Sequence, residues 1–404
     1  MQILVISSKF PFPLKDGGAV ATYALISGLS KLNNQLFVLS FNTQKHFIEP
    51  KDIPATAFDK IAYSLVDADT SPRILSAISN LAFSKLPYIL ERFKSQKFEQ
   101  ELIRILGSNN FDIVQIEGLY MLQYIPIIRQ YSNAKIAYRP HNVEFQIWDK
   151  LSLSSSGILK KLYFKILSDR ILKYELSLLN TYDLILPISN EDANIFNHSG
   201  NRLPCLVVPT GFEIQNIEIT PIELNNPSLF FIGSLEWLPN QEGIIWFLNN
   251  CWDVLHNKFP NLKWYIAGRN APINFEKKFD KPGIEWKGEI DNASEFIKDK
   301  SIMIVPLLSG SGMRIKIIEA FAHAKPVVST SLGARGTMAQ DDESILLADS
   351  PEKFIEQIIR LFEQAQLFKK LAINGHEHAK SMFDNNFISK TLMTFYSQHL
   401  THNK

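Results

Sequence analysis

The sequence has little cysteine, no long apolar run and almost no net charge. Its 404 residues contain two cysteines, Cys205 and Cys251, without metal-ligand spacing, so a disulfide framework is excluded and a reducing compartment is expected. A formal net charge of +1 gives no whole-molecule field for nucleic acid. No stretch approaches the roughly 20 apolar residues of a membrane span, and the N-terminus lacks a basic secretory region. We therefore expect a cytoplasmic protein, at most bound at the inner face of a membrane.

The chain is too long for one compact core and suits two α/β domains. Short apolar runs alternate with amphipathic stretches of helical length, a pattern typical of βαβ units in parallel sheets. The pattern restarts near residue 228. The predicted strands are Ile3–Ile6, Leu36–Ser40, Ile113–Ile116, Lys135–Tyr138 and Leu184–Pro187, followed by Leu229–Ile232, Lys263–Ala267, Ile284–Trp286, Met303–Pro306 and Pro326–Ser329.

These two runs predict an α/β protein with two doubly wound, Rossmann-like domains facing across a cleft. We place the N-terminal domain at residues 1–208, the second domain at 209–382 and a C-terminal helix at 383–404. Periodicity leaves open whether that helix closes the second domain or packs back on the first. Ligands of such sheets bind at the carboxyl ends of the strands, so we expect the site in the cleft.

The strongest local signal is a strand, a glycine-rich turn and a helix between Pro306 and Glu319. Gly310 and Gly312, on either side of Ser311, allow a ligand to approach the backbone closely. The free N–H groups at the start of the following helix favour an anion. The pattern therefore predicts an anion-binding turn.

Three charged residues at the start of this helix point to a nucleotide. Arg314 and Lys316 occupy its first turn, an unfavourable place for cations unless an anion is close. A diphosphate would supply that anion, and the carboxylate of Glu319 suits the hydroxyls of a ribose. The alternative is a surface helix in which Lys316 and Glu319 form an i,i+3 pair.

Together with Ala320-Phe-Ala-His-Ala-Lys-Pro-Val-Val328, this segment resembles the donor signature of glycosyltransferase family 4, retaining enzymes of the GT-B fold. The resemblance extends over nearly the whole chain. It includes Gly17-Gly18, Arg139-Pro-His-Asn-Val-Glu144, Leu186-Pro-Ile-Ser-Asn-Glu191, Val208-Pro-Thr-Gly-Phe-Glu213, Phe231-Ile-Gly-Ser-Leu235, Ile266-Ala-Gly268 and Trp286-Lys-Gly288.

The resemblance implies transfer of a sugar, with retention, from a nucleotide diphosphate sugar to a hydroxyl acceptor. The acceptor would be a glycan, a lipid-linked glycan or a polysaccharide precursor. It implies no cofactor, since the nucleotide sugar is the donor substrate. No metal is predicted either, because no Asp-x-Asp pair follows a predicted strand. The leaving diphosphate would help to deprotonate the acceptor on the same face.

The chain departs from the family pattern at two places. Ser311 stands where the family commonly has the first of two glutamates, and only the second, Glu319, is present. The usual basic pair after the first strand of the second domain is replaced by Ser234 and Asn240. Arg314 and Lys316 could supply the missing phosphate charge. Ser311 leaves open a non-catalytic nucleotide-sugar-binding subunit, and a nucleotide-sugar epimerase is a further alternative.

The remaining candidates carry a functional and a purely structural interpretation. Gly17 and Gly18 could admit a ligand or form a plain strand-to-helix turn. His141 follows a predicted strand and resembles the family histidine that approaches the transferred sugar, but it could be a structural residue. Gly288, Glu289 and Ile290 resemble the turn that meets the nucleobase.

One helical stretch, residues 157–179, is rich in lysine and arginine interleaved with apolar residues. A basic amphipathic helix of this kind can contact an anionic membrane. The alternative is a helix packed on its own domain with a solvated basic face. The sequence predicts no nucleic-acid partner.

Overall fold

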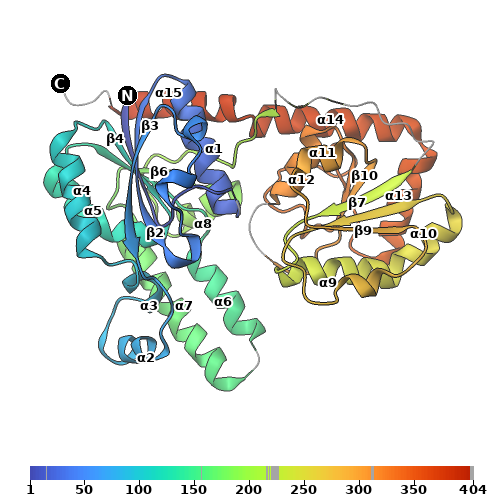
Figure 1. The fold of residues 1–404 in the computed structure, drawn as a ribbon, viewed down its shortest axis with the longest axis horizontal. Helices are drawn as coiled ribbons and strands as arrows, with labels where there is room; N and C mark the ends of the chain where they lie inside the picture. Colours follow the sequence, from blue (N-terminus) through green and yellow to red (C-terminus); the bar gives the residue numbers. More distant parts are fainter. Residues whose placement is uncertain are drawn as a thin grey trace. The chain divides into compact units, whose positions relative to one another are not determined.

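The computed structural model describes residues 1–14, 16–155, 157–214, 217, 219, 227–310 and 314–400, apart from the side chain of Ser154. The chain divides into two compact units (Figure 1). The first combines Met1–Gly211 with Asn385–Lys404, and the second is Phe212–Asp384. The chain therefore leaves the first unit once and returns to it through its last helix.

The first unit is built on a six-stranded parallel sheet with the order β3-β2-β1-β4-β5-β6. Its strands are β1 (Gln2–Ser7), β2 (Gln35–Thr43), β3 (Ile61–Ala68), β4 (Ile113–Glu117), β5 (Lys135–Arg139) and β6 (Leu184–Ile185). Its helices are α1 (Gly17–Lys31), α2 (Ile74–Phe83), α3 (Tyr88–Glu91), α4 (Gln96–Ser108), α5 (Ile125–Tyr131), α6 (Glu144–Ser154), α7 (Ile158–Leu178), α8 (Asn190–His198) and α15 (Asn385–Leu400).

Both faces of this sheet are buried, which explains why its central strands are mostly apolar; Gln115, Glu117 and Arg139 are buried polar exceptions. In β1, Leu4 and Ile6 face the core under α4, α5 and α7, whereas Ile3 and Val5 face the core under α1 and α15. The last helix, α15, completes that second core with Leu392 and Tyr396, both fully buried.

The second unit repeats the architecture with the strand order β12-β11-β10-β7-β8-β9. Its strands are β7 (Ser228–Ile232), β8 (Lys263–Ala267), β9 (Ile284–Gly288), β10 (Ile302–Val305), β11 (Val327–Ser329) and β12 (Leu346–Leu347). Its helices are α9 (Leu238–Phe247), α10 (Asp253–Lys258), α11 (Ala293–Lys298), α12 (Ile315–Ala322), α13 (Pro351–Glu363) and α14 (Ala365–Phe383). Again the strand residues alternate between two cores, with Leu229 and Phe231 in one and Phe230 in the other.

Each sheet starts at a central strand, grows outward and then restarts on the other side of that strand. The reversal lies between β1 and β4 in the first unit and between β7 and β10 in the second. Loops leave such a pair of strands in opposite directions, which opens a crevice at their carboxyl ends. The topology therefore places one candidate site at the end of β1 and β4 and another at the end of β7 and β10.

The predicted α/β architecture with two doubly wound sheets is confirmed, and each predicted strand overlaps an observed one. The sequence did not predict β3 or β12. Because β3 ends within Asp67-Ala-Asp69, an Asp-x-Asp pair does stand at a strand end, contrary to the premise of the sequence analysis. Within the described ranges, no helix combines the length and apolar character required to cross a bilayer.

Candidate active site

The loops at the carboxyl ends of β7, β8 and β9 are joined by backbone hydrogen bonds. Gly233 N donates to Ala267 O (3.2 Å), Leu235 N to Arg269 O (2.8 Å) and Gly268 N to Gly288 O (2.8 Å). Gly268 fits here because a Cβ at this position would lie 2.2 Å from the carbonyl oxygen of Gly233. The result is a fixed edge of backbone at the reversal point of the second sheet.

Lys316 points from the first turn of α12 toward this edge. Its Nζ donates to Asn240 Oδ1 (2.8 Å) and lies 4.1 Å from the ring centroid of Phe231, and Asn240 in turn donates to Ser234 O (2.7 Å). Burial, together with the nearby Arg314 guanidinium, lowers the pKa of the lysine to about 7. Asn240 and Ser234 thus orient the lysine.

Arg314 is the residue that precedes α12, and it is buried. Its guanidinium carbon lies 5.1 Å from the ring centroid of Trp237. Gly310, with a φ of 112°, packs against the same tryptophan: a Cβ there would lie 2.6 Å from the ring. Burial and the charge of Arg335 lower the pKa of Arg314 to about 10. Two cations therefore gather where the helix dipole also disfavours them, an arrangement that an anion would stabilise.

Glu319 follows Lys316 on α12 and is half-buried. Burial raises the pKa of its carboxyl to about 7. The predicted residues Gly288, Glu289 and Ile290 lie at the end of β9, beside the loop after β8. Ser311 and Gly312 lie outside the described residues. We name the group formed by Asn240, Arg314, Lys316 and Glu319 the Lys316 cluster.

In the first unit the reversal point holds a buried carboxylate. Glu117, the last residue of β4, accepts hydrogen bonds from Thr22 Oγ1 (3.0 Å) and Arg139 Nη1 (3.1 Å), and His141 Nε2 lies 2.5 Å from its Oε2. Burial alone would raise the pKa of Glu117, but Arg139 and His141 outweigh this effect and lower it to about 2. Glu117 is therefore an ionised carboxylate that orients the His141 imidazole.

A second layer connects this carboxylate to the C-terminal helix. Gln115 Nε2 donates to Glu117 Oε1 (2.5 Å), and Tyr396 Oη of α15 donates to Gln115 Oε1 (2.8 Å). We name the group formed by Gln115, Glu117, Arg139 and His141 the Glu117 network. It lies entirely within the first unit.

The start of α1 lies beside His141. A Cβ on Gly18 would lie 3.5 Å from His141 Nδ1 and 3.3 Å from Lys9 Nζ. Gly17 is the first residue of α1, and Asp16 caps that helix by accepting from Ala19 N (3.0 Å) while pairing with Lys9 (2.5 Å).

Some residues at the two sites escaped the sequence analysis. Trp237 carried no signal of its stacking on Arg314. Glu117 was a weaker candidate from its place at a strand end, and Gln115, two residues earlier in the same strand, lies on the same face but was not predicted. Asp16 before Gly17 was readable as a helix N-cap.

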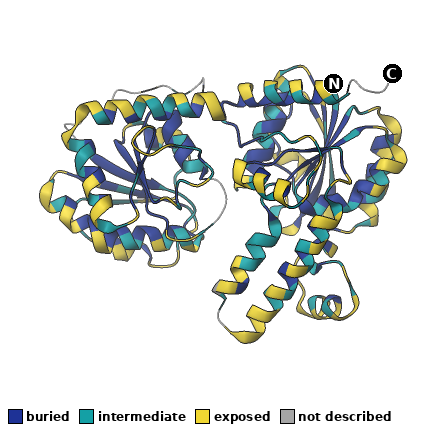
Figure 2. Cartoon of the chain, turned by 180° about the vertical axis from the view of Figure 1, so that it is seen from behind, coloured by how far each residue is buried: buried dark blue, intermediate teal, exposed yellow. Residues whose placement is uncertain are grey.

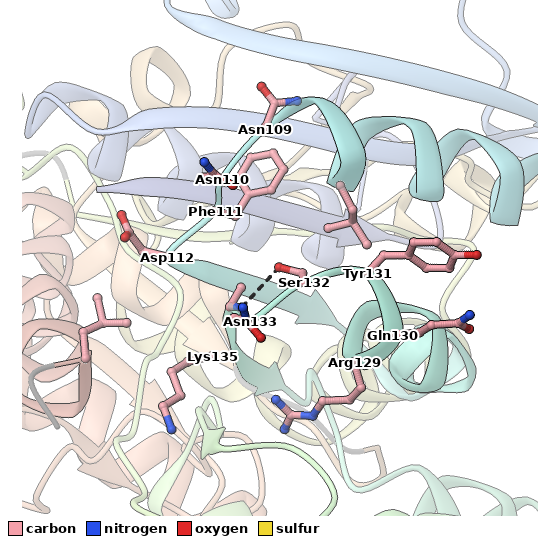
Figure 3. Close-up of a pocket in the computed structure, with 13 residues that line it drawn as sticks. Asn109, Asn110, Phe111, Asp112, Arg129, Gln130, Tyr131, Ser132, Asn133 and Lys135 are labelled. Atoms are coloured by element: carbon pink, nitrogen blue, oxygen red, sulfur yellow. Dashed lines mark hydrogen bonds between the residues drawn. The ribbon is translucent and has the colours of Figure 1, made fainter. Parts of the chain in front are cut away.

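A pocket of about 550 Å³ lies elsewhere in the first unit (Figure 3). It is lined by the segments that lead into β4 and β5, among them Asp112 and Lys135, with Arg129 of α5. It thus lies at the amino ends of the strands, the edge of the sheet opposite Glu117. The Glu117 network does not contribute to it.

Comparison with known proteins agrees with this geometry. Residues 226–364, most of the second unit, match the family described as glycosyl transferases group 1. An uncharacterised 44.6 kDa protein in the cps region of Klebsiella pneumoniae is 23% identical over 95% of this chain and 96% of its own length. An uncharacterised glycosyltransferase of Methanocaldococcus jannaschii is 32% identical over 26% of this chain and 31% of its own.

Solved structures with a similar fold cover the whole chain or nearly all of it. Anabaena HepE in complex with UDP has a TM-score of 0.70 at 13% identity, with 98% of this chain and 100% of that one covered. Sucrose-phosphate synthase from Thermosynechococcus elongatus has a TM-score of 0.70 at 14% identity, with both chains fully covered. The fold is that of the GT-B glycosyltransferases.

The backbone edge of the second unit allows a first prediction. Gly268→Ala should lower the free energy of unfolding by about 1–3 kcal/mol, because its Cβ would meet the Gly233 carbonyl. Gly233→Ala is the comparison: its Cβ would lie 2.7 Å from Lys316 Nζ and 3.0 Å from Asn240 Nδ2, two side-chain atoms that can shift more easily than a backbone carbonyl, so its loss should be smaller. Urea unfolding followed by tryptophan fluorescence measures both, since five of the six tryptophans lie in the second unit. Equal losses in the two variants would contradict the prediction.

Proposed function

We propose that the protein transfers a glycosyl unit, with retention, from a nucleotide diphosphate sugar to a hydroxyl of a glycan or lipid-linked acceptor, as a member of glycosyltransferase family 4. One observation carries the proposal. Arg314 and Lys316 are held together at the reversal point of the second sheet, both with lowered pKa values. Burial destabilises the charged forms of these side chains, and a bound phosphate group would compensate for the hydration that they have lost.

The Lys316 cluster divides the recognition of the donor among its members. Arg314 offers a planar guanidinium for bidentate contact with the diphosphate, and Lys316 acts as a point charge that Asn240 orients. Glu319 accepts hydrogen bonds from the ribose hydroxyls. Backbone groups at Gly288, Glu289 and Ile290 meet the edge of the base. Ser311 belongs to the predicted donor site, but it replaces the family's first glutamate, so no carboxylate contact to the transferred sugar is assigned to this position.

The proposed transfer makes one bond at the anomeric carbon and breaks another on the same face. The acceptor hydroxyl oxygen bonds to the anomeric carbon while the bond from that carbon to the diphosphate oxygen breaks. The hydroxyl proton passes to the leaving diphosphate, so the products are a glycoside and a nucleoside diphosphate. Arg314 and Lys316 stabilise the charge that develops on the leaving group, where fixed cations contribute most.

Donor binding tests the proposal directly. We expect ligand-observed NMR with UDP-, GDP-, ADP- and TDP-sugars to detect one preferred donor, UDP-linked sugars being the first to try because neighbouring structures hold UDP. Glu319→Ala should weaken that binding about 10- to 150-fold through loss of charge-assisted hydrogen bonds. Glu377→Ala, an exposed glutamate on α14 of the same unit, is the matched control and should bind as wild type does.

The products decide between the proposal and its alternatives. A glycoside that keeps the anomeric configuration of the donor supports the transferase. Ser311 favours one rival, a subunit that binds the donor without turning it over, and binding without any product would support that rival. An altered free nucleotide sugar would identify an epimerase. Folded protein that binds none of the donors contradicts the proposal.

The proposal also predicts a bell-shaped pH dependence of donor affinity. Lys316 loses its proton above a pKa of about 7, and Glu319 gains one below a pKa of about 7. Because binding needs the charged form of both, affinity should be highest near neutral pH and fall by up to about tenfold per pH unit on either side. A nucleotide sugar is the right probe, since its diphosphate is doubly esterified and does not titrate in this range.

Single substitutions assign the two sides of this profile. Lys316→Met should remove the decrease at alkaline pH, and Glu319→Gln should remove the decrease at acidic pH. Calorimetric titrations between about pH 5.5 and 8.5 measure both. A wild-type affinity that stays constant over this interval would show that neither group titrates on binding.

His141 should contribute to turnover and not to nucleotide affinity. We propose that its imidazole, oriented by Glu117 (2.5 Å), hydrogen-bonds a hydroxyl of the transferred sugar in the transition state. His141→Ala should then lower kcat about 10- to 150-fold while UDP affinity changes less than about twofold. The matched control is His198→Ala at the exposed end of α8. An unchanged kcat in the His141 variant excludes this role.

A further inference from the structure

The first unit exposes large apolar side chains on two neighbouring elements. In the hairpin of α6 and α7, Ile158 and Leu159 are 86% and 83% exposed. In α2, Leu75 and Phe83 are 82% and 90% exposed. Both elements lie at the same end of the unit (Figure 1), and exposed residues gather there in Figure 2. The α2–hairpin surface denotes Ile74, Leu75, Phe83, Leu153, Ile158 and Leu159.

Helix α2 is turned the opposite way from a normal surface helix. Its polar Asn80 is 7% exposed and faces inward, where Nδ2 donates to Leu86 O (2.9 Å). Its Ile74, Leu75, Ile78 and Phe83 side chains are exposed, whereas Leu81 is half-buried. An apolar helix of this composition is ordinarily buried, so an outward apolar face indicates a binding surface.

Polar contacts fix this orientation. Arg170 of α7 donates to Leu81 O (2.7 Å) and Asn80 O (3.3 Å), which fastens the C-terminal half of α2 to the hairpin. Farther along α7, Leu167 and Ile171 are buried in the core of the unit. The exposed apolar part of the hairpin is therefore its end, and α7 as a whole has no continuous apolar face along its length.

The charges around this surface are mainly positive. Residues 70–90 and 150–168 contain no aspartate or glutamate, and the neighbouring Asp69, Asp149 and Asp169 pair with Arg73 and Lys165. The two ranges also carry Lys85, Lys150, Lys160 and Lys161, all exposed. Lysines that flank exposed aliphatic and aromatic side chains match an anionic lipid surface, where the apolar groups enter the interface and the ammonium groups meet phosphates.

The same charges argue against a second copy of the chain as the occupant. A two-fold symmetric dimer would bring the surface against itself and would gather Lys85, Lys150, Lys160 and Lys161 with their copies in one interface. We propose that the α2–hairpin surface docks the protein onto an anionic lipid bilayer, through the hairpin end and α2 and not along the whole of residues 157–179. This inference goes beyond the transfer reaction and does not depend on it.

Vesicle co-sedimentation of the full chain tests the inference. Wild type should bind phosphatidylcholine vesicles containing about 30% phosphatidylglycerol, should bind pure phosphatidylcholine at least tenfold more weakly, and should lose affinity between about 0.05 and 0.5 M salt. Ile158→Ser combined with Leu159→Ser, and separately Phe83→Ser, should each weaken binding at least tenfold. Lys160→Ala combined with Lys161→Ala should reduce the salt dependence.

The controls separate docking from folding and from donor binding. Ile273→Ser replaces an equally exposed isoleucine (93%) in the second unit and should bind vesicles as wild type does. All variants change exposed side chains, so their melting temperatures and nucleotide-sugar binding should be unchanged. Wild type that binds neither vesicle, or binds both equally, overturns the inference. A dimer in light scattering that Phe83→Ser dissociates would assign the surface to a second copy and also overturn it.

Discussion

Removing a charge from water costs several kcal/mol unless an opposite charge replaces the lost hydration, and the two units meet this cost differently. In the first unit the buried Glu117 carboxylate receives Arg139, His141, Thr22 and Gln115, so the charge is stable as built. In the second unit Arg314 and Lys316 lie beside aromatic rings, and burial together with neighbouring positive charge lowers their pKa values. The first arrangement fixes a side chain, whereas the second creates affinity for an anion.

The two units differ in the residues that lie at the carboxyl ends of their central strands. A parallel sheet covered on both faces leaves its carboxyl edge as the place where polar groups can gather. In the first unit Glu117 is the last residue of a strand, and its carboxylate is hydrogen-bonded to side chains of the same unit. In the second, Gly233, Gly268 and Gly310 remove side chains from the edge, and the resulting space is occupied by the ends of Lys316 and Trp237. The absence of a Cβ at these glycines therefore makes room for the side chains of the Lys316 cluster and for Trp237.

Part of both sites was predictable from sequence. The central strands were found because each is apolar and buried on both faces, and Arg314, Lys316 and Glu319 followed from their place at one helix start. Strand β3 was missed because it is an edge strand of mixed burial. Asn240 was noted only as standing where the family has a basic residue, and its contact with Lys316 could not be read from the sequence. The contact of Tyr396 with Gln115 joins residues 281 positions apart, which no local pattern reveals.

The return of the chain to the first unit has a consequence for the order of synthesis. A ribosome delivers residues 1–211 first, yet the core under α1 stays open until Leu392 and Tyr396 emerge. The second unit, in contrast, has all of its residues once Asp384 has been made. The first unit is thus the last that can be completed. Until α15 is synthesised, the apolar surface under α1 is exposed and must be covered by something other than α15 to avoid aggregation.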